Sequence, residues 1–246
     1  MTMGKLRLFL RRYLHFLPLE RQQEVLDELA QASRPGFEYF LLVILSCIIA
    51  TLGLITDSAA VIIGAMLVAP LMSPILGLSL ASVAGEQRMF RQSIIGLAEG
   101  VFLALLLSTF TGWLARLLPF GVLTTLPGEV LARTHPTPFD LGIALAGGAA
   151  ASYALAQPRL SAALPGVAIA TALMPPVCTV GLGVSLGDSN IAMGASLLFI
   201  TNFAAISFAG ILVFAALGFR PRYLDNGWHG LPRSVWASAI LVTLVT

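Results

Sequence analysis

The feature that most constrains this chain is the recurrence of apolar stretches long enough to cross a lipid bilayer. A helix of about 20 apolar residues spans the roughly 30 Å of hydrocarbon. Only 11% of the residues are charged and 57% are apolar, whereas about a quarter of a soluble domain is charged. The sequence therefore predicts an all-α integral membrane protein. Its six predicted spans are 39–55, 58–84, 93–117, 141–156, 161–186 and 191–217.

The spans fall into two groups of three, and the remaining residues flank them. Residues 5–32 are amphipathic, with a break at Pro18 and a second short helix at about 20–32, so they are expected to lie at the membrane surface. The last apolar stretch, 235–246, is too short to cross and predicts an incomplete seventh span. The predicted segments are a surface region (1–36), a first membrane repeat (37–118), an extracytoplasmic loop (119–138), a second membrane repeat (139–218) and a cytoplasmic loop with the seventh span (219–246).

Basic residues divide unequally between the two sides of the predicted stack. If the N-terminus is cytoplasmic, only Arg116 and Arg133 of the 14 Lys and Arg residues lie outside. Cytoplasmic loops carry the excess of positive charge, so the sequence predicts an N-inside orientation. The net charge of +2 is too small, and the charges too scattered among loops, to suggest nucleic-acid binding.

The second and fifth spans resemble each other at an offset of 102 residues. In this alignment a glycine, two leucines, a methionine and a proline coincide; the pairs are Gly64 and Gly166, Leu71 and Leu173, Met72 and Met174, Pro74 and Pro176, and Leu80 and Leu182. The two copies are offset by three spans, an odd number, which reverses their direction in the membrane. The sequence therefore predicts two inverted repeats, an arrangement common in transporters.

Prolines interrupt both of these spans. A proline inside a helix frees the carbonyl four residues earlier, so the expected free carbonyls belong to Met66 and Pro70 in one span and to Thr171 and Ala172 in the other. We expect Pro70, Pro74, Pro175 and Pro176 to meet near mid-membrane and to form a site for an ion or polar solute. The alternative is two simple kinks whose carbonyls are satisfied by Ser73, Thr171 or Thr179.

Polar side chains are rare within the other spans. Glu99 lies in the third span, and Thr201 and Asn202 lie mid-way along the sixth. The 102-residue offset pairs Glu99 with Thr201, so each repeat carries a polar position at a similar depth. Such residues are costly in lipid and usually functional. The alternatives are that Glu99 faces water and that Asn202 only joins helices.

The predicted outer loop adds a polar cluster, in which Glu129 and Arg133 have the spacing of a helical ion pair. Chemical motifs are otherwise absent: no phosphate-binding loop, metalloprotease motif or nucleophile elbow is present, and the cysteines, Cys47 and Cys178, read as core residues. The sequence therefore predicts neither an enzyme nor a cofactor. The small residues of the fourth span favour close helix packing and a homo-oligomer.

Four stretches resemble one bacterial and archaeal membrane family. They are GLITDSAAVIIGAMLVAPLMSPILGLSLA, EVLARTHPTPFDLGIALAGGAAASYAL, LPGVAIATALMPPVCTVGLGVSLGD and LLFITNFAAISFAG. The chain is similar over residues 37–219 to the "uncharacterized hydrophobic domain" family, also called domain of unknown function three-eight-nine. The resemblance implies a compact multi-span domain in a prokaryotic inner membrane and no established substrate. The family's recurring polar positions correspond to Ser58, Glu129, Arg133, Thr134, Asp140 and Asn202.

These observations lead to two functional hypotheses. The first is a transporter or channel for a small solute or ion, with its site at the proline-broken segments. The second is a membrane scaffold or sensor that oligomerises and serves soluble parts elsewhere. Water or an ion at the midplane would favour the first, and a dry, fully packed midplane the second.

Overall fold

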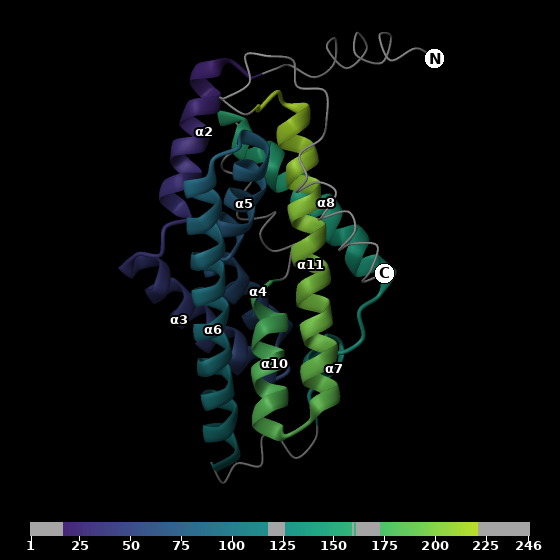
Figure 1. Ribbon diagram of the computed structural model, residues 1–246. Helices are drawn as coiled ribbons and strands as arrows, with labels where there is room; N and C mark the ends of the chain where they lie inside the picture. Colours follow the sequence, from purple (N-terminus) through teal and green to yellow (C-terminus); the bar gives the residue numbers. More distant parts are fainter. Residues whose placement is uncertain (1–16, 118–125, 159, 161–172, 221–246) are drawn as a thin grey trace.

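The computed structural model describes residues 17–117, 126–158, 160 and 173–220, and every statement about the structure concerns these residues. All of the regular elements in them are helices, as predicted (Figure 1). The helices are α2 (Leu19–Ala32), α3 (Phe37–Ile55), α4 (Ala59–Val68), α5 (Met72–Ala84), α6 (Gln87–Leu117), α7 (Gly128–Leu131), α8 (Pro138–Ala156), α10 (Met174–Leu186) and α11 (Ser189–Ala216).

Four of these helices, α3, α6, α8 and α11, are long and apolar enough to cross a membrane. The bent pair of α4 and α5 makes a fifth if it counts as one span. This composition supports an all-α membrane protein. The first predicted amphipathic segment, residues 161–172 of the fifth span and the seventh span lie outside the described residues.

The long helix α6 begins six residues before the predicted span. Its 31 residues reach about 46 Å, which exceeds the hydrocarbon thickness. Arg88 and Arg91 belong to the extra turns, and both are exposed. The hydropathy pattern locates the part of a helix that suits lipid, but hydrogen bonding within the backbone lets the helix continue beyond it.

Each of the two long helices, α6 and α11, packs against three other helices of the described chain. Helix α6 contacts α3, α5 and α10, and α11 contacts α8, α10 and α5. In Figure 1, α5 and α10 lie between α6 and α11, with α5 in the upper half and α10 in the lower half. Helices α5 and α10 therefore each pack on both long helices: on the one that follows directly in the chain and on the one in the other half of the chain.

The outward face of α6 is apolar. Phe102, Leu106, Phe110 and Trp113 follow one another at helical spacing and are each at least half exposed. In water such a stripe would be unfavourable, but against lipid chains it costs nothing. The inner faces carry small residues instead, and a Cβ atom added to Gly148 of α8 would lie 2.7 Å from the Cα of Ile206 of α11. Close van der Waals contact between backbones thus holds these helices together.

The turns between the paired helices are alike. Gly85 ends α5 with φ 71° and Gly187 ends α10 with φ 73°, a left-handed conformation that suits glycine. In both turns the next backbone N–H bonds a carbonyl in the last turn of the helix, from Glu86 to Ala81 at 3.1 Å and from Asp188 to Gly183 at 3.0 Å. Each turn then leads directly into a long helix.

Candidate functional site

The first predicted break is a real bend in the helix. Helix α4 ends at Val68, α5 begins at Met72, and the two axes differ by 49°. Pro70 lies in the break, but Pro74 lies in the first turn of α5, where its missing N–H costs little. Pro74 therefore helps α5 to begin, rather than interrupting a continuous helix. Met66 is buried and Ser73 is half-buried beside this break.

The second predicted break is described from its C-terminal side. Helix α10 begins at Met174, and Pro175 and Pro176 are buried in its first turn, where the missing N–H costs little because first-turn N–H groups have no partner within the helix. Thr179 is buried and donates to the carbonyl of Pro175 at 2.9 Å. Its hydroxyl is therefore used within α10, on a carbonyl other than those of Thr171 and Ala172 that the sequence predicted to be free. Thr171 and Ala172 lie outside the described residues.

Helix bounds in the two halves match at a nearly constant offset. Adding 102 to the bounds of α5 gives those of α10, and adding 101 to the bounds of α3 gives those of α8. Helix α6 begins at residue 87 and α11 begins at residue 189, again 102 apart. Both short helices begin toward mid-height and run to opposite ends of the molecule (Figure 1).

The contacts between the halves also match in pairs. Ser79 of α5 packs on Gly210 of α11, since a Cβ added to Gly210 would lie 3.0 Å from the Ser79 Oγ. Ser108 of α6 packs on Gly181 of α10, where an added Cβ would overlap the Ser108 Oγ. At an offset of 102, Ser79 corresponds to Gly181 and Ser108 to Gly210. The same crossing is thus made twice, with serine and glycine exchanged.

Asn202 is buried half-way along α11. It is 5% exposed, and its Oδ1 has no hydrogen-bond partner among the described residues. The neighbouring Thr201 is also buried, but its hydroxyl donates to the carbonyl of Leu197 at 2.8 Å. An unpaired amide oxygen in a membrane interior costs several kcal/mol. Asn202 is therefore the predicted site residue whose surroundings most call for a ligand.

Glu99 differs from Asn202 in its surroundings. Its side chain is exposed on α6, whereas the next residue, Gly100, is buried. A Cβ added to Gly100 would lie 3.1 Å from the Cδ2 of Leu71, the residue that precedes α5. The face of α6 that meets the break is therefore the face of Gly100. Glu99 points elsewhere and does not share a buried site with Asn202.

The predicted outer cluster gathers around the short helix α7. Glu129 and Arg133 form the predicted ion pair at 2.7 Å, and the buried Thr134 donates to Leu131 O at 2.7 Å. Asp140 accepts from the backbone and hydroxyl of Thr137 and so caps the start of α8. Ser58 precedes α4 without a side-chain cap. These contacts hold the loop in place, and they give its polar residues structural partners.

One residue of this cluster escaped the sequence reasoning. Asp57 Oδ1 accepts a hydrogen bond from the backbone N–H of Glu129 at 2.7 Å, which joins the α3–α4 turn to α7. Asp57 has φ 53°, a left-handed conformation that Asp adopts more readily than most residues. Its position in the turn sequence Thr-Asp-Ser was the available signal.

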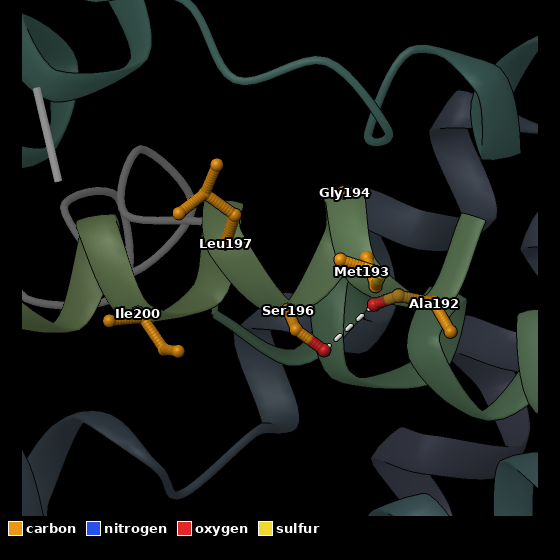
Figure 2. Close-up of a pocket in the computed structure, with 6 residues that line it drawn as sticks. All are labelled: Ala192, Met193, Gly194, Ser196, Leu197 and Ile200. Atoms are coloured by element: carbon orange, nitrogen blue, oxygen red, sulfur yellow. Dashed lines mark hydrogen bonds between the residues drawn. The ribbon is translucent and has the colours of Figure 1, made fainter. Parts of the chain in front are cut away.

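A separate groove lies along α11 near its start (Figure 2). Ala192, Met193, Gly194, Ser196, Leu197 and Ile200 line it, and its volume is about 510 Å³. Ser196 donates to the carbonyl of Ala192 at 2.7 Å, so the hydroxyl in this lining is already satisfied. The groove is apolar and offers nothing to orient a polar solute. Within the described residues, no group of three or more His, Cys, Asp or Glu side chains could hold a metal ion.

Comparisons with known protein families and proteins show which family this chain belongs to. The domain of unknown function DUF389 matches residues 66–208, more than half of the chain. The chain belongs to this family. It is 30% identical over 225 residues to the uncharacterized protein MJ0678 of Methanocaldococcus jannaschii, covering 92% of this chain and 67% of that protein. No solved structure matches the chain.

Proposed function

We propose that this protein is a membrane transporter or channel for a small solute or ion, with its site where α5 and α10 begin. The observation that carries the proposal is the buried Oδ1 of Asn202, at the middle of α11, which has no hydrogen-bond partner in the part of the chain that the structure describes. A bound solute would supply the missing partner. The membrane is the inner membrane of a prokaryote, the N-terminus is cytoplasmic, and the protein forms a homo-oligomer.

The site is built from two inverted three-helix repeats related by a two-fold axis in the membrane plane. The matched bounds of α5 and α10 and the exchanged serine–glycine contacts support this relation. Under it, Asn202 is equivalent to Gly100, which packs on Leu71 just before α5. Asn202 is then expected beside Leu173, just before α10.

The two half-helices also favour one sign of charge. A helix carries about half a positive charge at its N-terminus, and acidic caps offset it where α8 and α11 begin, at Asp140 and Asp188. Helices α5 and α10 begin with no side-chain cap and no acidic residue in the first turn. The buried polar residues of the described core are all uncharged: they are serines, threonines and Asn202. The helix starts favour a negative charge or a polarised oxygen, and the Asn202 Oδ1 needs a hydrogen-bond donor, so the site suits a small solute that presents both.

Flux into sealed proteoliposomes tests the proposal. The panel includes small anions, small cations and neutral polar solutes, and the comparison is between the wild type and Asn202→Leu. The variant keeps the size of the side chain, removes the amide and is expected to abolish flux of the transported solute. Thr201→Val is the matched control, because the Thr201 hydroxyl is satisfied within its own helix. Glu99→Gln tests whether the exposed carboxylate assists the passage of a cation. If the carboxylate does so, this variant has a lower cation flux than the wild type.

A contrary result has a clear meaning. If no solute of any charge crosses, and Asn202→Leu disrupts the assembly, Asn202 is a structural contact and the scaffold hypothesis replaces transport. If wild type and Asn202→Leu transport equally well, the midplane site is wrong.

A further inference from the structure

Helix α2 joins parts of the bundle that are far apart in sequence. Val25 and Leu29 are fully buried on its inner face, and the helix contacts both α5 and α8. Just before it, the backbone N–H of Leu17 donates to the carbonyl of Leu217, directly after α11, at 3.3 Å. The segment thus touches both proposed repeats at the same end of the molecule.

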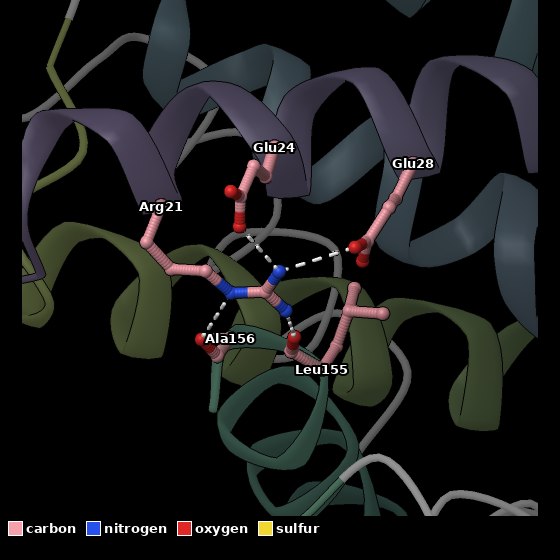
Figure 3. A network of polar contacts seen from close by, with 5 residues as sticks. All are labelled: Arg21, Glu24, Glu28, Leu155 and Ala156. Atoms are coloured by element: carbon pink, nitrogen blue, oxygen red, sulfur yellow. Dashed lines mark hydrogen bonds and ion pairs between the residues drawn. The ribbon is translucent and has the colours of Figure 1, made fainter. Parts of the chain in front are cut away.

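One arginine makes the polar part of this junction (Figure 3). Arg21 donates to the carbonyls of Leu155 at 3.1 Å and Ala156 at 3.3 Å, the last two residues of α8. The same guanidinium bonds Glu24 at 3.0 Å and Glu28 at 3.1 Å on its own helix. A cation at a helix C-terminus is favoured by the helix dipole, and the planar guanidinium reaches several acceptors at once.

The charge of Arg21 is secure in this position. Burial alone would lower the pKa of Arg21, but the hydrogen bonds that it donates to Glu24 and Glu28 raise that pKa above its ordinary value. The two carboxylates are more than half exposed, whereas the arginine side chain is 14% exposed. The polar contact with α8 therefore depends on the Arg21 side chain, which bonds two carboxylates on α2 and two carbonyls of α8.

The far end of the same segment reaches the break. Ser33, which directly follows α2, is 1% exposed and donates to the carbonyl of Ser73 at 3.1 Å. Ser73 is the second residue of α5. A Cβ added to Gly77 or Gly96 would meet Ser33 within 3.0 Å, so little space separates the segment from α5 and α6. The segment from Leu17 to Ser33 covers the start of α5 from this side.

From these contacts we infer that α2 is a clamp that closes access to the start of α5 from the N-terminal side. Arg21 holds the clamp closed through its hydrogen bonds to the end of α8. Opening on this side requires Arg21 to leave the carbonyls of Leu155 and Ala156 and Ser33 to leave Ser73. The role of the clamp depends on the proposed function, because closing a pathway matters only in a protein through which a solute passes. Its closure of the α5 start can be measured without any transport.

The test uses the rate at which a small charged thiol reagent labels Ser73→Cys in protein held in nanodiscs. The native cysteines are buried, and the protein without Ser73→Cys gives their background. Adding Arg21→Gln is expected to raise the labelling rate about tenfold, because hydrogen bonds from a charged group are lost. Arg34→Gln is the matched control: it also removes one positive charge near α2, from an exposed side chain. Arg21→Lys keeps the charge without the planar fork, and an intermediate rate is expected.

A second position separates local opening from general loosening. Ser185→Cys lies near the end of α10, at the opposite end of the molecule, and its labelling rate is expected to stay constant. Equal rates at Ser73→Cys in Arg21→Gln and Arg34→Gln, or equal increases at both positions, would overturn the clamp. Flux of the transported solute in liposomes is then compared, and Arg21→Gln is expected to increase it. Faster labelling with no flux in any variant leaves the clamp and overturns the transport proposal. Flux of the solute with labelling rates that do not change supports the transport proposal and overturns the clamp.

Discussion

The Sγ atoms of Cys47 and Cys178 lie 3.7 Å apart, although 131 residues separate them in the chain. Cys47 belongs to α3 and Cys178 to α10, and each is at most 1% exposed. The Cys47 thiol also donates to the carbonyl of Ala104 of α6 at 3.2 Å. Three helices from both proposed repeats therefore meet at this pair.

We predict that a membrane-permeant oxidant joins these two thiols within one chain. The reaction removes two electrons and two protons and forms one S–S bond, which requires the sulfur atoms to approach by less than 2 Å from their present separation. Free thiols in the denatured protein are expected to fall from two to none. Cys47→Ser and Cys178→Ser each keep one free thiol under the same treatment. Two thiols that persist after complete exposure to oxidant would show that α3 and α10 do not meet here.

A second prediction compares two glycines of α8. An added Cβ at Gly148 would lie 2.7 Å from Ile206 Cα, whereas nothing lies within 4 Å of one at Gly142. We expect Gly148→Ala to destabilise the fold by about 1–3 kcal/mol, because backbone must move to admit the methyl group. Gly142→Ala is expected to stabilise it by about 0.5–1 kcal/mol, since alanine loses less conformational freedom than glycine in a helix. Thermal unfolding in detergent measures both, and a lower midpoint for Gly142→Ala than for Gly148→Ala would contradict the packing.

The residue pattern predicted this fold well where local rules decide it. Apolar length located α3, α6, α8, α11 and the bent pair of α4 and α5, and the Glu129–Arg133 spacing gave the ion pair that is present at 2.7 Å. The prolines were expected to break two spans: the first break is present as the 49° bend between α4 and α5, and the second lies partly outside the described residues. Their meaning was only partly right, because Pro74, Pro175 and Pro176 lie in first turns, where the missing N–H costs little.

Contacts between distant residues could not be derived in the same way. Nothing in the sequence says that Arg21 reaches Leu155 and Ala156, or that Cys47 meets Cys178. Both relations depend on how whole helices pack, and helix packing in lipid follows small differences in side-chain shape. For the same reason, the sequence placed Glu99 and Asn202 in one site, whereas Glu99 is exposed and Asn202 is buried.

A third prediction concerns the orientation of the chain in the membrane. Twelve of the 14 basic residues lie on the N-terminal side of the predicted stack, and the excess of Lys and Arg marks the cytoplasmic side. Arg88 and His135 are both exposed. Arg88 lies in the first turn of α6, and His135 lies in the loop between α7 and α8, so the spanning helix α6 comes between them in the chain. In intact cells, an impermeant thiol reagent is expected to label His135→Cys and not Arg88→Cys. Labelling of Arg88→Cys alone would reverse the orientation.

The last prediction tests the two-fold relation through its exchanged contacts. At one crossing α5 contributes Ser79 and α11 contributes Gly210, and at the other α10 contributes Gly181 and α6 contributes Ser108. If the repeats are equivalent, the second crossing should accept the arrangement of the first. Gly181→Ser alone is expected to cost about 1–3 kcal/mol, because its Cβ overlaps Ser108. Ser108→Gly removes that obstacle, so the double variant should recover much of the lost stability. A Cβ at residue 181 would still lie 2.9 Å from the backbone nitrogen of Thr109, which is why the recovery is expected to be incomplete.

Thermal unfolding of the wild type, both single variants and the double variant gives the coupling free energy. Additive losses, with no recovery in the double variant, would mean that the two crossings are not equivalent and would remove the main support for inverted repeats.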